Sequence, residues 1–212
     1  MSFCKGGRGG GSPLRVAVSS CVCKTRGVKV IFRRTGERRY AVVVQVPGKS
    51  AQTMNPAPGF DAHIPHDLVH YVVEAELRLH AGVYGRAARG GGTFWTAERA
   101  TSTRERARQR RKQARREVEL NRSDGHDQEL AASERLAGLC DLAWRRCHGQ
   151  RPDPGRIAPS LSATRDDAQR IERVLARLDQ LAPIWNALPV DAELAFLWPT
   201  LTPQLRHEST KP

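Results

Sequence analysis

The chain has 212 residues, of which 39% are hydrophobic, and this composition suits one domain with a buried core and further polar segments. No apolar run approaches the roughly 20 residues of a membrane-spanning helix, and the N-terminus lacks the apolar core of a secretion signal, so we expect a cytoplasmic protein without a membrane partner. The formal net charge of +13 favours anionic partners such as nucleic acid, although the preference for arginine over lysine also follows from a GC-rich genome.

The first strand signal follows a Gly-rich stretch, residues 1–27, which we interpret as a flexible tail. Runs of β-branched and aromatic residues at 28–34 and 39–46 flank the Gly-containing connection 35–38, and this pattern predicts a β-hairpin. A lone hairpin is only marginally stable in water, so we expect another strand or helices to cover one of its faces.

A proline-rich loop at 47–63 leads into a helix that we expect to run from Pro65 to about His80, with Gly82 as its C-terminal stop. At 100° per residue, the apolar side chains fall on one side of this helix. The opposite side carries Asp67, His70, Glu74 and Arg78, with His66 at its margin. The pattern therefore predicts an amphipathic helix whose apolar side faces the core.

Residues 82–95 form a Gly-rich connector without the features of a phosphate-binding loop, and we interpret it as a flexible loop. A helix is expected at about 101–120. Between Arg99 and Arg116 the chain has nine basic residues and one acid, Glu105, and this stretch accounts for most of the net positive charge. Because few apolar side chains occur in it, we expect the helix to protrude or to lie along the surface.

Two further helices are expected at about 127–147 and 164–182, each with apolar residues at helical spacing. A short strand is expected at 192–198, beside the hairpin, and we interpret the residues from Thr200 onward as a tail. These elements predict an α+β fold in a single domain, residues 28–199. Its small antiparallel sheet, made of the N-terminal hairpin and a C-terminal strand, is packed with about four helices, one of them long and Arg-rich.

The first candidate site is the histidine-rich start of the first predicted helix. His66 and His70 are four residues apart, the spacing with which zinc metalloproteases bind their metal ion. These histidines are the candidate zinc ligands, and His63 is a conceivable third ligand. Asp67 and Glu74 are the candidate catalytic residues of a metal-dependent hydrolase, although the protease motif has glutamate where this chain has Asp67. The alternative is a structural face of helix-stabilising pairs that binds no cofactor.

The second candidate site is the Arg-rich helix. Arginine side chains along a protruding helix neutralise phosphates, which produces salt-sensitive and largely sequence-independent binding. The candidate nucleic-acid-binding residues are Arg104, Arg108, Arg110, Arg111, Lys112, Arg115 and Arg116. The segment lacks aromatic residues for base stacking, and the alternatives are a solvated basic face enlarged by codon bias or a docking surface for an acidic protein.

The strings Pro-Gly-Phe-Asp, Pro-His-Asp-Leu-Val-His and Leu-Trp-Pro, together with the hairpin, resemble open reading frames of GC-rich bacteria. The resemblance covers residues 28–199 and implies no function and no site residue. From the residues themselves, our leading hypothesis is a non-enzymatic protein that binds nucleic acid or another polyanion. The alternative hypothesis is a metal-dependent hydrolase that uses His66 and His70.

Overall fold

The computed structural model describes residues 27–57, 61, 63–91, 95–96, 126–150 and 163–207, together with five helical positions between 108 and 118. The predicted N-terminal tail, apart from residue 27, and most of the predicted helix at 101–120 lie outside the described residues. Within the described part of the chain, no helix has both the length and the apolar character needed to cross a membrane.

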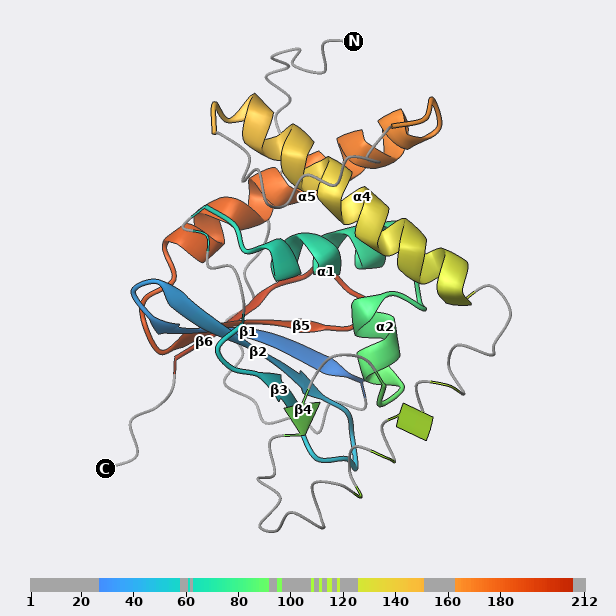
Figure 1. The fold of residues 1–212 in the computed structure, drawn as a ribbon. Coiled ribbons are helices and arrows are strands. Elements are labelled where there is room, and N and C mark those ends of the chain that lie inside the picture. The colour runs from blue at the N-terminus through green and yellow to red at the C-terminus, as the bar shows by residue number, and fades with distance from the viewer. Residues whose placement is uncertain are drawn as a thin grey trace.

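A six-stranded antiparallel sheet underlies the helices (Figure 1). Its strands are β1 (Lys29–Gly36), β2 (Arg39–Gln45), β3 (Gln52–Met54), β4 (Trp95–Thr96), β5 (Ala192–Leu197) and β6 (Gln204–His207). They lie in the order β4-β3-β2-β1-β5-β6, and each neighbouring pair is antiparallel. The predicted hairpin is confirmed as β1 and β2, and the predicted C-terminal strand is confirmed as β5, which pairs with β1.

The sheet extends beyond the predicted strands at both edges. β3 lies in the predicted loop 47–63, β4 begins at the last residue of the predicted Gly-rich connector, and β6 lies in the predicted C-terminal tail. These three interpretations are therefore wrong for the strand residues that they cover. β6, the longest of the three, has four residues, and such short segments show too little alternation to be recognised as strands. They form because a neighbouring strand supplies hydrogen-bonding partners; Leu205 of β6, for example, pairs with Leu194 of β5.

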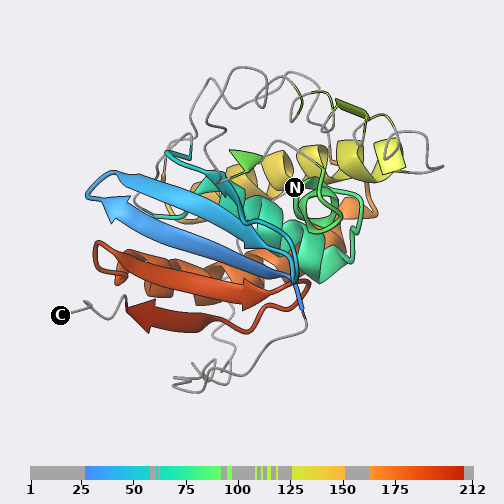
Figure 2. The ribbon, with the colours of Figure 1, turned by 90° about the horizontal axis from the view of Figure 1, so that it is seen from below.

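The helices described in full are α1 (His66–Leu77), α2 (Val83–Ala88), α4 (His126–Cys147) and α5 (Asp167–Asn186). α1 lies between the sheet and the crossing pair α4 and α5, and α2 lies near one end of α1 (Figure 1). Figure 2, seen from below, shows the opposite face of the sheet, which none of these helices covers. The predicted α+β class is confirmed, whereas the prediction of a flexible loop at 82–95 is wrong for the residues of α2.

The core between the sheet and α1 is rich in aromatic side chains. Phe32 of β1, Phe196 of β5 and Tyr71 of α1 are all fully buried. The ring of Tyr71 lies 4.7–6.0 Å, between centroids, from the rings of Phe32, Tyr84, Phe196 and Trp198. Its hydroxyl donates a hydrogen bond to the carbonyl oxygen of Thr200 at 2.8 Å. Because each buried aromatic side chain contributes about 1.5–3 kcal/mol, this cluster fixes α1 on the sheet.

α1 ends earlier than predicted, and its last residue is Leu77. Arg78 follows in the left-handed conformation, with φ of 57°, and its N–H donates to the carbonyl oxygen of Glu74. This geometry ends a helix in the way that glycine commonly does, at a modest cost for a residue with a Cβ atom. Gly82, the predicted stop, instead precedes the first turn of α2.

Candidate functional site

His66 and His70 lie on consecutive turns of α1 and face α4. Their rings are nearly perpendicular, at 86°, with centroids 4.7 Å apart. The Nδ1 atom of His66 lies 3.6 Å from Oδ2 of Asp141, and Nε2 of His70 lies 3.5 Å from Oε2 of Glu134. The predicted pair is therefore brought together, and two carboxylates of α4 lie beside it.

His70 is almost completely removed from solvent. Only 6% of the residue is exposed, and its Nδ1 atom has no hydrogen-bond partner among the described residues. Burial, together with the neighbouring His66, lowers the pKa of His70 to about 3. The imidazole of His70 is therefore neutral at physiological pH.

Asp67, the first candidate catalytic residue, is held by the sheet. The hydroxyl of Tyr40 on β2 donates to Oδ2 of Asp67 at 2.5 Å, and the hydroxyl of Tyr84 on α2 donates to its backbone carbonyl oxygen at 2.8 Å. Asp67 also lies in the first turn of α1, where the helix dipole favours a negative charge. These contacts make Asp67 an anchor between α1, the sheet and α2.

Glu74, the second candidate catalytic residue, is fully buried and caps α2. Its carboxylate accepts hydrogen bonds from the backbone N–H groups of Val83 at 2.6 Å, Tyr84 at 2.9 Å and Gly85 at 3.4 Å. It also accepts one from the hydroxyl of Ser133 on α4, at 2.8 Å. The first N–H groups of a helix have no partner within the helix, so this distant carboxylate takes the place of a local cap. Burial raises the pKa of Glu74 to about 7, although the four hydrogen bonds act in the opposite direction.

Two glycines leave room for this arrangement. A Cβ atom on Gly82 would lie 2.3 Å from Cδ and Oε1 of Glu74, and one on Gly85 would lie 1.9 Å from the carbonyl oxygen of His80. Both distances are far below contact distance, so neither position accepts a larger residue without a shift of its surroundings. Gly82 and Gly85 are therefore explained by the close approach of Glu74 and of the backbone before α2.

Arg145 of α4 fixes the loop that precedes α1. Its guanidinium, which is buried, donates to Oδ1 of Asp141 at 3.0 Å, to Oδ2 of Asp61 at 2.6 Å and to the carbonyl oxygen of Ile64 at 3.4 Å. The other carboxylate oxygen of Asp61 accepts from the backbone N–H groups of His63 at 2.8 Å and Ile64 at 3.2 Å. A buried arginine with two carboxylate partners stabilises this loop strongly only while all three groups are present.

The polar side of α1 is thus covered by α4 around His70 and Glu74, which are buried, whereas Arg78 after the helix and Glu134 of α4 are exposed. We call the α1 residues His66, His70 and Glu74 and their α4 partners Ser133, Glu134, Asp141 and Arg145 the polar layer. Sequence reasoning missed the α4 members because it followed only the apolar arc of that helix. A signal was present, since Ser133 and Asp141 are eight residues apart and lie on the same side of a helix, next to the buried arc.

The two candidate zinc ligands, His66 and His70, lie side by side. Among the residues that the structure describes, however, no group of three or more His, Cys, Asp or Glu side chains is arranged to hold a metal ion. His63 is exposed in the loop before α1, and the carboxylate of Asp141 is engaged by Arg145. In the described residues, the polar layer joins α1 to α4 through the hydrogen bond from Ser133 to Glu74 and through the close approaches of His66 to Asp141 and of His70 to Glu134.

The second candidate site is the predicted Arg-rich helix, and the structure describes five of its residues. Arg108, Arg111 and Arg115 are helical and exposed, and so are Ala114 and Val118. The other predicted nucleic-acid-binding residues, which are Arg104, Arg110, Lys112 and Arg116, lie outside the described residues. At 100° per residue, the three described arginines fall within an arc of about 60° on an ideal helix. They therefore belong to one helix face that is open to solvent.

The two candidate sites differ in what they offer to a ligand. Most ionisable side chains of the polar layer have hydrogen-bonding or charged partners within the protein. The three described arginines of the basic segment, our name for residues 99–116, are instead exposed. No protein-family model matches the chain, and no curated protein or solved structure is significantly similar to it.

Proposed function

We propose that the protein binds nucleic acid or another polyanion through its basic segment, residues 99–116, and that it does so in the cytoplasm. The observation that carries the proposal is the exposure of Arg108, Arg111 and Arg115 on one helical face. At 1.5 Å per residue, the three guanidinium groups are distributed along about 10 Å of helix. Such a row of charges can contact several phosphates of one strand without reading its sequence.

The balance of charge in the basic segment supports the same proposal. Its nine basic residues accompany a single acid, Glu105, so they cannot all be neutralised within the segment. Elsewhere, several arginines have acidic partners. Examples are Arg33 with Glu193 at 2.5 Å, Arg135 with Asp167 at 2.6 Å and Arg177 with Glu76 at 3.1 Å. The excess positive charge is therefore concentrated where the described side chains are exposed.

The proposal predicts binding that weakens steeply as salt rises. We would titrate fluorescently labelled double-stranded DNA, single-stranded RNA and heparin with the full chain, following anisotropy over a series of salt concentrations. For B-DNA the slope of log K against log salt concentration is about −0.9 per phosphate neutralised, so three contacts give about −2.7 and seven give about −6. Little difference is expected between DNA sequences, because contacts to phosphates carry no sequence information and the segment has no aromatic side chain to stack on bases.

The deciding variant replaces Arg108, Arg111 and Arg115 with Gln. Its matched control replaces Arg38, Arg165 and Arg170 with Gln; these arginines are exposed on other elements, so the net charge falls by the same amount. Loss of binding in the first variant and retention in the control supports the proposal. Equal losses would assign binding to net charge alone, and absence of binding to all three polyanions at low salt would reject it. In that case an acidic protein becomes the better candidate partner.

A further inference from the structure

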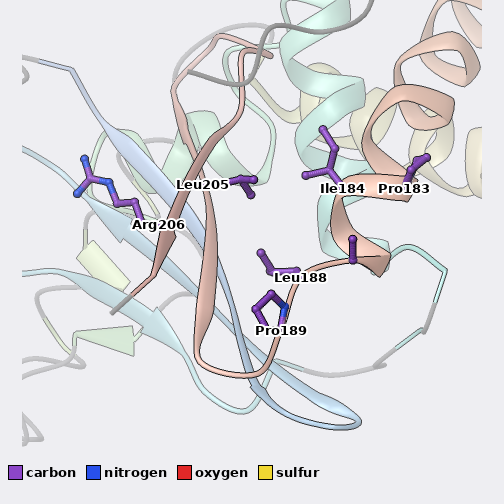
Figure 3. A pocket seen from close by; sticks show the side chains of 7 residues that line it. Pro183, Ile184, Leu188, Pro189, Leu205 and Arg206 are labelled. Atoms are coloured by element: carbon purple, nitrogen blue, oxygen red, sulfur yellow. The ribbon is translucent and has the colours of Figure 1, made fainter. Parts of the chain in front are cut away.

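β6 is the last strand of the sheet, and an apolar pocket lies beside it. The pocket has a volume of about 400 Å³ and is lined by Pro183, Ile184, Ala187, Leu188, Pro189, Leu205 and Arg206. These residues come from the C-terminal turn of α5, the connection to β5 and the edge strand itself (Figure 3). Its volume is at the lower end of the range of ligand pockets in proteins, about 300–1,000 Å³.

The side chains of β6 alternate between the two faces of the sheet. Leu205 pairs with the buried Leu194, so its side chain lies on the helix-covered face and reaches the pocket, whereas Arg206 pairs with Glu193 on the opposite face. Figure 3 shows these two side chains pointing in opposite directions. The edge therefore offers an apolar pocket on one face and a guanidinium on the other.

The face that carries Arg206 is positively charged near this edge. Glu193 accepts two hydrogen bonds from the guanidinium of Arg33, at 2.9 and 2.5 Å. Neither Arg206 nor Lys29 forms an ion pair with a described residue. Burial and the charge of Arg206 lower the pKa of Lys29, although the nearby Glu193 acts in the opposite direction. An acidic group placed beside Arg206 would therefore relieve repulsion between the two cations.

The apolar surface continues along the connection that follows α5. Val190 is 48% exposed, and Pro189 and Ala187 are also exposed. A row of unpaired backbone groups beside exposed apolar side chains is a template for an added strand. No described strand pairs with the outer edge of β6.

From this arrangement we propose that β6 and the neighbouring pocket bind an extended peptide segment of a partner protein, which adds to the sheet as a further strand. The residue opposite Leu205 is apolar and enters the pocket, and the adjacent residue is acidic and contacts Arg206. Main-chain hydrogen bonds to β6 supply affinity, and the two side chains supply specificity. This site is separate from the basic segment and does not depend on polyanion binding.

The test uses a labelled, N-acetylated peptide of sequence Glu-Val-Glu-Leu-Glu-Val. We expect saturable binding to the full chain, with slower hydrogen exchange of the backbone amides of 204–207. The Lys-Val-Lys-Leu-Lys-Val peptide, and the Glu peptide with N-methylated amides on its strand-pairing edge, should each bind at least about tenfold more weakly.

Two protein variants locate the site. Ala187→Glu places a charge at the exposed rim of the pocket, and Arg206→Glu reverses the charge on the other face; each should weaken peptide binding by about tenfold or more. Arg38→Glu, an exposed change of equal charge in the hairpin turn, should leave binding unchanged. Binding that persists in Ala187→Glu, or that occurs without protection of 204–207, would overturn the proposal. So would protection of 204–207 that rises with protein concentration alone, because the edge would then belong to a second copy.

Discussion

The polar side of α1 and the basic segment both gather ionisable side chains at helical spacing, yet they lie in opposite environments. In α1, His70 is 6% exposed and Glu74 is fully buried, and both lie against residues of α4. In the basic segment, Arg108, Arg111 and Arg115 are exposed. A pattern of charges on a helix therefore predicts which side chains share a face, but not whether another helix covers that face.

The physical reason for the difference is the cost of removing charges from water. A buried carboxylate without partners is strongly unfavourable, so the charges of the polar layer persist only because each has hydrogen-bonding or charged neighbours. Glu74, with four hydrogen bonds, is the clearest case. A run of arginines with a single acid has too few acidic partners for its charges to be buried, so these side chains remain in water. We therefore expect substitutions in the polar layer to reduce stability and substitutions in the basic segment to reduce binding.

The largest effect is expected from Arg145→Met, which leaves Asp61 and Asp141 without their shared cation. The variant should lose about 3–5 kcal/mol of unfolding free energy, because breaking a buried ion pair leaves an uncompensated charge. Urea denaturation measures this loss. The neighbouring Arg146 is exposed, and Arg146→Met should change the free energy by less than about 0.5 kcal/mol. Similar losses in the two variants would show that the buried ion pairs of Arg145 are unimportant.

A smaller loss is expected from Gly82→Ala, whose Cβ would lie 2.3 Å from the carboxylate of Glu74. We expect about 2–3 kcal/mol of destabilisation, as for other overpacked sites. Because the clash is with Glu74 itself, the same change in a Glu74→Ala background should cost clearly less, and a double-mutant cycle measures the difference. Gly27→Ala, which meets Leu197 at an ordinary 3.7 Å, is the control. Additive effects of Gly82→Ala and Glu74→Ala would contradict the capping geometry.

These two predictions concern Arg145 and Gly82, whose contacts can be predicted only partly from the sequence. The β1–β2 hairpin and β5 are predictable because long runs of β-branched and apolar residues have few other stable arrangements. α2 and β6 are not, because six and four residues carry too little pattern, and both depend on distant partners. Glu74 and Gly82 are eight residues apart in sequence, yet no local rule predicts that a carboxylate inside one helix caps the next. The burial of His70 could not be predicted either, because the spacing of polar residues in α1 does not show that α4 packs on the polar side of the helix.

The stability of the polar layer should depend on pH in two opposite ways. The pKa of His70 falls from 6.5 to about 3, so the stability that neutral His70 contributes is lost as pH falls through this interval. The pKa of Glu74 rises from 4.5 to about 7, so its contribution is lost as pH rises through that interval. Between pH 4.5 and 6.5 the two effects oppose each other, each with a slope of up to about 1.4 kcal/mol per pH unit.

The variants His70→Gln and Glu74→Gln separate these contributions. Urea denaturation between pH 4.5 and 6.5 should show the stability of the wild type rising with pH relative to His70→Gln and falling relative to Glu74→Gln. Differences that stay constant across this range would mean that neither group changes its proton affinity on folding.

The smallest effect on stability is expected in the basic segment. The triple variant of Arg108, Arg111 and Arg115 to Gln should retain the unfolding free energy of the wild type within about 0.5 kcal/mol, because exposed substitutions away from packed features have little effect. Thermal and urea denaturation measure this quantity. A loss of several kcal/mol would place these arginines within the packed structure and would remove the contrast with the polar layer.

The most direct measurement of the central claim is the salt dependence of DNA binding by this triple variant. If the three arginines neutralise phosphates, the slope of log K against log salt concentration should become less negative by about 2.7 relative to the wild type. The control variant at Arg38, Arg165 and Arg170 should keep the wild-type slope. An unchanged slope in the triple variant, with the fold intact, would show that the basic segment does not bind the polyanion.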